Sequence, residues 1–177
     1  MRTSALTTWV DKWAMRYPVL AEREKLGDLY DRKRKSFRLD QLEIIYRWKY
    51  ARLWPDRKVA ALRANCDERQ ARDWTRRAIS CPDDLGALAF VHLLPGANAA
   101  GGSAILTVAD QKRFTVMDRR AIKSLVCLGQ WDPTVQGTTA SATHWIEYLR
   151  ECRKISERTN RSLRTVDHAL YQSRGRQ

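Results

Sequence analysis

The stretch LLPGANAAGGSAIL, residues 93–106, is unlike the sequence on either side of it. The rest of the chain is rich in Arg, Lys, Trp and Leu, whereas nearly every side chain here is small. Gly96 and Asn98 can supply the positive φ values that a tight turn demands. The leucines before the turn would end one helix, and residues 99–106 would open a second. The stretch therefore predicts two helices joined by a short turn.

The small residues of this hairpin admit two interpretations. In the first, they let another backbone come close, so that N–H groups at the turn and at the helix start bind a phosphate without any side chain. In the second, they form an ordinary corner between two tightly packed helices. Pro-Gly is common in such turns. Under the first interpretation the backbone-binding positions are Pro95, Gly96, Asn98, Ala100, Gly101 and Gly102.

Helical periodicity dominates the remaining sequence, and it predicts an all-α compact bundle of about eight or nine short helices. The first helix is expected over residues 4–16, with Pro18 after its end, and a charged helix over residues 19–34. A third is expected over residues 39–54. Three further signals mark helix ends: Asp67 as an N-cap, Asp83 or Asp84 as another, and Gly129 as a stop. Residues 113–117 are expected to be briefly extended.

A length of 177 residues, 44% of them hydrophobic, fits a single helical domain. Within it we expect basic N-terminal helices over residues 1–35 and a core over residues 36–129 that contains the hairpin. Residues 130–177 would form a loop and C-terminal helices that pack back on the core.

The chain is strongly basic, with 33 Lys and Arg against 20 Asp and Glu, a net charge of +13 and a pI near 10.1. Such an excess favours a polyanionic partner, and we expect double-stranded DNA, bound in a salt-dependent way. Residues 32–35 and the pair Arg76 and Arg77 add to the cationic surface. The alternative is a basic protein whose charges are solvated and bind nothing in particular.

The N-terminus carries charges and tryptophans where a signal peptide needs an unbroken apolar run, and no segment approaches a membrane span. We expect a cytoplasmic protein associated with the bacterial nucleoid. The four cysteines never form CxxC and the three histidines are scattered, so no metal site and no cofactor are expected. No obligatory protein partner is evident, and a monomer is expected.

After the hairpin comes DQKRFTVMDRRAIKSL, in which Asp118 stands before a new helical run. The order of leucine-flanked hairpin, small-residue helix, short extended piece and aspartate resembles the helix–hairpin–helix superfamily of DNA glycosylases. LPGAN, with Ala104 and Ile105, is similar to the LPGxG motif of that family and the helix after it. Asp118 falls where the family places its catalytic aspartate. The resemblance covers residues 89–128, about a quarter of the chain.

The resemblance implies that Asp118 is catalytic. Breaking an N-glycosidic bond builds positive charge on the deoxyribose, and a fixed carboxylate stabilises that charge or activates water, once the base has been flipped out of the duplex. An aspartate before a helix is also an ordinary N-cap, and the two roles are compatible. Arg119 and Arg120 would neutralise flanking phosphates.

Bifunctional members of the family carry a lysine on the helix after the hairpin, and this position is Ala100 here. No lysine lies between Leu93 and Gln111, so the resemblance implies a monofunctional glycosylase that leaves an abasic site. A bifunctional enzyme with a relocated lysine is the alternative. Its candidates are Lys49, Lys112 and Lys123, each of which also fits a phosphate contact or a solvated charge.

Base pockets in such enzymes are lined by aromatic and apolar side chains. The candidates for the pocket, or for a wedge into the duplex, are Trp48, Lys49, Asn65, His92 and Trp131. Each also has a structural interpretation. The tryptophans suit a core, Asn65 suits the end of a helix, and His92 suits a buried position.

The sequence does not specify which base is excised. Alkylated, oxidised and deaminated bases all fit, which would make the protein a base-excision repair glycosylase. The short chain is also similar to small bacterial antiviral glycosylases that attack hypermodified cytosine, such as glucosylated hydroxymethylcytosine, in phage DNA. A helix–hairpin–helix module that binds DNA without chemistry is the alternative from a different functional class.

Overall fold

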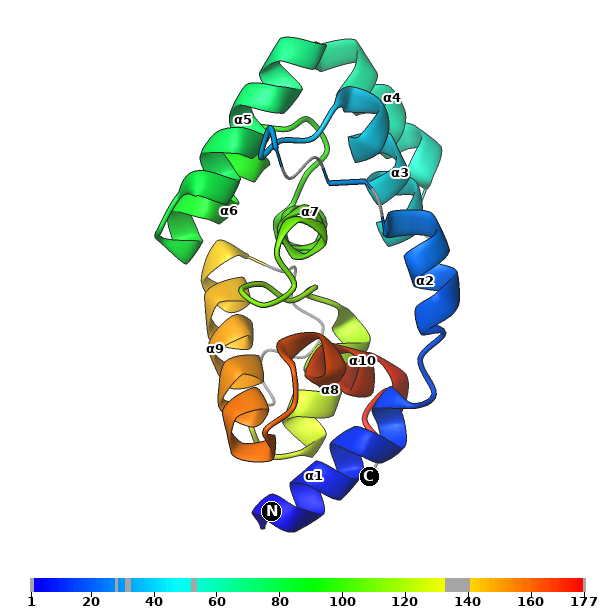
Figure 1. Cartoon of the computed structure of the whole chain (residues 1–177), viewed down its shortest axis with the longest axis vertical. Coiled ribbons are helices and arrows are strands. Elements are labelled where there is room, and N and C mark those ends of the chain that lie inside the picture. Colours follow the sequence, from blue (N-terminus) through cyan, green and yellow to red (C-terminus); the bar gives the residue numbers. More distant parts are fainter. Residues whose placement is uncertain (1, 28, 31–32, 52–53, 133–140, 177) are drawn as a thin grey trace. The chain divides into compact units, whose positions relative to one another are not determined.

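The computed structural model describes residues 2–27, 29–30, 33–51, 54–132 and 141–176 (Figure 1). In this part of the chain it has ten α-helices and no strand, which confirms the all-α expectation and exceeds the expected number of helices. The helices are α1 (Thr3–Ala14), α2 (Val19–Leu26), α3 (Leu39–Lys49), α4 (Pro55–Asn65), α5 (Glu68–Ser80), α6 (Asp84–His92), α7 (Ala99–Ala109), α8 (Arg119–Cys127), α9 (Ala142–Thr159) and α10 (Leu163–Ser173).

Local sequence explains most of the helix ends. Asp67 caps α5: its carboxylate accepts from Gln70 N at 2.7 Å, and the Gln70 side chain accepts from Asp67 N at 3.0 Å. Asp83, not Asp84, caps α6 by accepting from Gly86 N. Gly129, at φ +66°, ends α8, as predicted.

Two helices are shorter than the sequence predicted. The helix expected over residues 19–34 ends at Leu26, before Gly27, and residues 33–35 form a turn. The helix expected over residues 39–54 ends at Lys49, and Trp54 starts the next helix in a left-handed conformation with φ +58°. Residues 113–117 are non-helical but form no strand. The apolar stripe of the third predicted helix continues to Leu53 in the sequence, whereas the helix itself ends at Lys49.

The chain divides into two units, and each is described separately. The discontinuous unit consists of Met1–Pro18 and Gln111–Gln177, and the continuous unit of Val19–Asp110. This division differs from the expected partition, because α1 groups with the C-terminal helices and because the hairpin and Asp118 fall in different units. That all parts form one domain stays a prediction.

In the continuous unit α7 is the central helix, and α3, α5 and α6 pack against it (Figure 1). Residues 101–107 are all buried, so α7 is apolar on nearly every side. In the discontinuous unit α10 has the same role, contacting α1, α8 and α9. The largest fully buried side chains of this unit are Trp145 and Tyr148 of α9 and Phe114.

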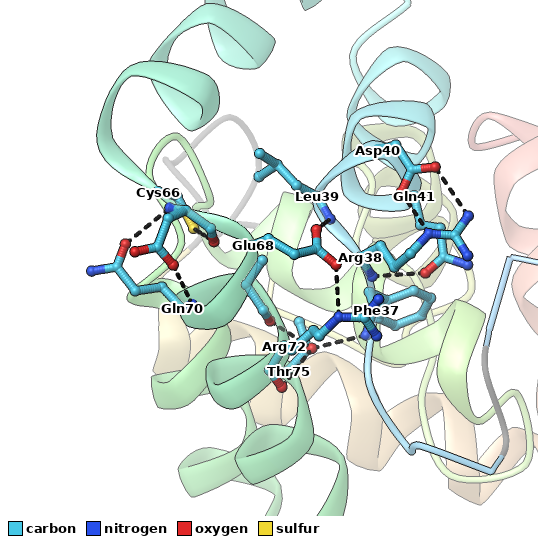
Figure 2. A network of polar contacts seen from close by, with 12 residues as sticks. Phe37, Arg38, Leu39, Asp40, Gln41, Cys66, Glu68, Gln70, Arg72 and Thr75 are labelled. Carbon is cyan, nitrogen blue, oxygen red and sulfur yellow. Dashed lines mark hydrogen bonds and ion pairs between the residues drawn. The ribbon is translucent and has the colours of Figure 1, made fainter.

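A polar network fastens the start of α3 to α5 within the continuous unit, and Figure 2 shows it from close by. Phe37 N donates to the buried Thr75 hydroxyl at 2.9 Å, and Leu39 N donates to the Glu68 carboxylate at 2.8 Å. The other oxygen of that carboxylate accepts from Arg72 at 2.6 Å. The contacts fix the first residues of α3, a helix that also packs against α7.

Candidate nucleic-acid interface and candidate carboxylate

Helices α6 and α7 are joined by a tight turn over residues 93–98, which we call the α6–α7 turn. Gly96 has φ +83°, as predicted, and Ala97 N donates to Leu94 O at 3.0 Å. The expectation of a positive φ at Asn98 is wrong: its φ is −117°, and its side chain caps α7 by accepting from Gly101 N at 3.0 Å. Asn98 is present because it caps the helix.

Three side chains from α3 and α4 hold the α6–α7 turn from within the continuous unit. The Tyr46 hydroxyl donates to Pro95 O at 3.2 Å, and the Tyr50 hydroxyl donates to Asn98 Oδ1 at 2.8 Å. Lys58 Nζ donates to Gly96 O at 3.0 Å and lies 5.2 Å from the centre of the Tyr50 ring. The turn is thus a supported, preorganised element with a cation beside it.

The small residues that open α7 make room for side chains of the same unit. A Cβ at Gly101 would lie 2.3 Å from the Tyr50 hydroxyl oxygen, and one at Gly102 would lie 2.9 Å from both Leu88 and Val91. The N–H of Gly101 bonds the Asn98 side chain, and that of Gly102 bonds Asn98 O. Tight internal packing therefore explains both glycines.

Burial keeps the two phenols of this site protonated. It raises the pKa of Tyr50 to about 12, against a smaller lowering by hydrogen bonds with Asn98 and Gly101, and it raises the pKa of Tyr46 further. His92, at the end of α6, is half-buried. Desolvation lowers its pKa, against a hydrogen bond with the Asn98 backbone. The base of the turn is thus lined by neutral rings.

The other pocket candidates of the continuous unit lie on α3 and α4. Trp48 and Lys49 are half-buried at the end of α3. Asn65 is exposed and is the last residue of α4, where its Nδ2 donates to Ala61 O at 3.0 Å, as the helix-ending interpretation predicted. A role for any of the three in a base pocket or as a wedge stays a prediction.

Asp118, in the discontinuous unit, is half-buried and caps α8 by accepting from Arg120 N at 2.9 Å. Arg119 beside it is exposed. The Arg120 guanidinium donates to the Tyr171 hydroxyl and lies 4.9 Å from the centre of that ring. The N-cap interpretation of Asp118 is confirmed, and its catalytic role stays a prediction.

Trp131, the remaining pocket candidate, lies in the discontinuous unit. Trp131 packs against the buried Tyr148, with ring centres 5.9 Å apart. Burial raises the pKa of Tyr148, and interactions with Cys152, Asp167 and Asp118 add to the effect. A role for Trp131 in a base pocket stays a prediction.

The discontinuous unit also has a cavity of about 510 Å³ with a mixed charged lining. Lys112, Arg153 and Arg164 contribute positive charge, and Glu157 contributes negative charge. Arg164 is paired with the buried Asp167 of its own helix.

The predicted site residues therefore fall into two groups. The continuous unit holds Pro95, Gly96, Asn98, Ala100, Gly101, Gly102, Trp48, Lys49, Asn65 and His92, and the discontinuous unit holds Asp118, Arg119, Arg120 and Trp131. Sequence reasoning missed Tyr46, Tyr50 and Lys58. The two tyrosines stand four residues apart on a predicted helix, a spacing that signals one shared face. Nothing in the sequence links Lys58 to the turn.

No group of three or more His, Cys, Asp or Glu side chains among the described residues is arranged to hold a metal ion. Within the same residues, no helix is both long enough and apolar enough to cross a membrane. Comparison with protein-family models, with curated proteins and with solved structures found no match.

Proposed function

We propose that the protein is a monofunctional DNA glycosylase that binds double-stranded DNA through the α6–α7 turn and uses Asp118 to hydrolyse the N-glycosidic bond. The observation that carries the proposal is the supported turn: Gly96 in a left-handed conformation, a neutral cap at Asn98, and Lys58 beside them. These features suit an anion that must be held through backbone groups, as a DNA phosphate is.

The proposed binding mode uses the first residues of α7. The start of a helix carries partial positive charge on N–H groups that have no partner within the helix. Asn98 caps α7 without adding negative charge, and Lys58 adds a positive one. A phosphate beside residues 95–100 would be stabilised by both positive charges. Gly101 and Gly102 would contribute only by allowing the close packing of α7. The net charge of +13 supports the same polyanionic partner.

The proposed chemistry is hydrolysis at C1′ of a flipped nucleotide. The bond between C1′ and the base breaks, its electron pair leaves with the base, and the base takes up a proton. The oxygen of a water molecule bonds to C1′. The Asp118 carboxylate stabilises the positive charge that develops on the sugar or accepts the proton of that water. Its bond from Arg120 N fixes its direction.

The monofunctional assignment rests on residue 100, which is alanine where lyase activity would need a lysine. We propose hypermodified cytosine in phage DNA, such as glucosylated hydroxymethylcytosine, as one substrate class. Alkylated or oxidised bases, in a repair role, are the other.

The test is an excision assay on duplexes with alkylated, oxidised, deaminated, hydroxymethylated and glucosylated bases, with wild type and Asp118→Asn in parallel. Alkali-dependent breaks produced by the wild type alone would support the proposal. Binding without breaks on every duplex would contradict it, and would leave a DNA-binding module in which Asp118 is only a helix cap.

The second candidate is the bifunctional enzyme with a relocated lysine. Lys58 joins Lys49, Lys112 and Lys123 as a candidate because its Nζ, 3.0 Å from Gly96 O, lies at the proposed DNA-binding turn. Borohydride trapping on a cleaved duplex distinguishes the two. A covalent adduct that Lys58→Gln abolishes would establish the lyase, whereas the absence of any adduct would leave the monofunctional enzyme.

A further inference from the structure

The residues before Asp118 form a buried segment without regular structure. Residues 113–117 belong to no helix and no strand, and Phe114, Thr115, Val116 and Met117 are all buried. A buried backbone outside helices and sheets needs other partners for its N–H and C=O groups, because leaving them unpaired is costly. In a helical unit those partners must come from side chains.

Side chains of α9 and α10 supply three of these partners. Arg153 donates to Arg113 O at 2.7 Å, Trp145 Nε1 donates to Thr115 O at 3.3 Å, and Val116 N donates to the Asp167 carboxylate at 3.4 Å. The last bond is long, but its acceptor is anionic, which strengthens it. The segment is thus held at successive points up to two residues before Asp118.

Asp167 is the unusual member of this set. It lies on α10, is 3% exposed and forms an ion pair with Arg164, which is 9% exposed. Its other oxygen lies 3.5 Å from the Tyr148 hydroxyl. A buried ion pair adds little net stability over apolar packing, because both charges must be desolvated. A carboxylate that also accepts a hydrogen bond from a backbone N–H fixes the orientation of that backbone group, which apolar packing does not.

We propose that Asp167 is a positioning residue for Asp118. By binding Val116 N it fixes the non-helical segment from which α8 starts, and so sets where the Asp118 carboxylate lies. The consequence for excision rests on the proposed function. The hold on the segment does not, because it can be measured without any substrate.

Three variants separate this role from ordinary stability. Asp167→Ala removes the acceptor for Val116 N. Trp145→Phe keeps an aromatic ring but removes the donor to Thr115 O, and it serves as the second probe if the first variant does not fold. Ser173→Ala is the control: Ser173 is buried on the same helix, and its hydroxyl contacts Leu170 O and Ser124 in the body of α8 instead of residues 113–117.

The first measurement is backbone hydrogen exchange of the full chain by NMR. We expect Asp167→Ala to speed exchange of the Val116 amide by about tenfold or more beyond any change in global stability, and Ser173→Ala to change it only in line with global stability. Unchanged protection of Val116 in both Asp167→Ala and Trp145→Phe would overturn the proposal.

The second measurement is single-turnover excision together with duplex affinity. Asp167→Ala should lower the rate constant by about 10- to 100-fold and leave Kd within about twofold, because a displaced carboxylate impairs the chemical step more than binding. Asp167→Asn, which keeps an oxygen at this position, should recover part of the rate. An equal loss in Ser173→Ala would overturn the positioning role. If the wild type excises nothing, the proposed function fails, and the Val116 exchange alone decides whether Asp167 holds the segment.

Discussion

The starts of α7 and α8 are both capped by a side-chain oxygen, but only the α8 cap carries a charge. Asn98 caps α7 by accepting from Gly101 N at 3.0 Å, and Asp118 caps α8 by accepting from Arg120 N at 2.9 Å. The α7 cap is neutral and exposed, whereas the α8 cap is acidic and half-buried. After the caps come small residues in α7 and arginines in α8.

This difference shows how a cap can decide what a helix start is able to bind. When the cap is neutral, the partial positive charge at the helix start can attract an external anion. When the cap is a carboxylate, its own negative charge interacts with that partial charge instead. The start of α7 is therefore suited to a phosphate. The carboxylate at α8 is suited to a developing positive charge. The most direct test of this difference is to make the α8 cap neutral and the α7 cap acidic.

The largest effect is expected for Asp118→Asn. Asparagine caps helices about as well as aspartate, so the folded state should keep its stability within about 0.5 kcal/mol. Excision should fall by about 10²- to 10⁴-fold, because the variant lacks the charge that we propose stabilises the sugar. Single-turnover kinetics and urea unfolding measure the two quantities. Loss of excision together with unfolding would not support a catalytic role.

The reciprocal change, Asn98→Asp, should weaken duplex binding by about tenfold and leave stability nearly unchanged, because a carboxylate still caps the helix but repels phosphate. Asn65→Asp adds the same charge at an exposed position of the same unit and is the control. Fluorescence anisotropy at fixed salt compares the two. Equal losses of affinity would show that only net charge matters.

Gly101→Ala should destabilise the protein by about 1–3 kcal/mol, because its methyl group would meet the Tyr50 hydroxyl. In a Tyr50→Phe background the nearest ring carbon would be 3.1 Å away, and the penalty should shrink. Urea denaturation of the wild type, Gly101→Ala, Tyr50→Phe and the double variant gives the coupling free energy between the two positions. Additive effects would contradict the packing account of this glycine.

Lys58→Gln should lower duplex affinity a few-fold and reduce the slope of log K against log salt by about 0.9, the value for one phosphate contact. Lys25→Gln is the control, because Lys25 is exposed on α2 of the same unit and lies outside the proposed site. Binding titrations at several salt concentrations give the slopes. An unchanged slope in Lys58→Gln would confine Lys58 to supporting Gly96.

The smallest effect concerns pH. Because burial lowers the pKa of His92 below its ordinary 6.5, the unfolded chain takes up a proton before the folded one does. Stability from this group is therefore lost as pH falls below about 6.5, and His92→Gln should reduce that loss. Urea unfolding of both proteins at about pH 7.5 and about pH 5.5 measures it. Equal losses in both would contradict a buried neutral His92.

The sequence predicted helix ends best where a capping or stop residue stands at the end itself. The caps at Asp67, Asp83 and Asp118 and the stop at Gly129 are local, so a few residues determine them. The overlong prediction for α3 came from an apolar stripe that continues past the end of the helix, and the one for α2 from a charged run that continues past Gly27. The ends of α2 and α3 depend on how the chain packs, which a pattern does not contain.

The turn itself was predicted, but what supports it was not. Gly96 follows from the demand for positive φ, which only a few residue types meet. Tyr50 and Lys58 reach the turn from far away in the sequence, and Asp167 reaches Val116 across 51 residues. Such contacts depend on the fold, and a single sequence holds no local sign of them.

The most direct test of the central claim counts products. Wild type and Asp118→Asn would be incubated with phage DNA that contains glucosylated hydroxymethylcytosine and with damaged duplexes, and free bases and abasic sites would be quantified by mass spectrometry. We predict one free base per abasic site from the wild type, no strand break before alkali, and neither product from Asp118→Asn. Release of no base from any DNA, or equal release by both proteins, would contradict the assignment of Asp118.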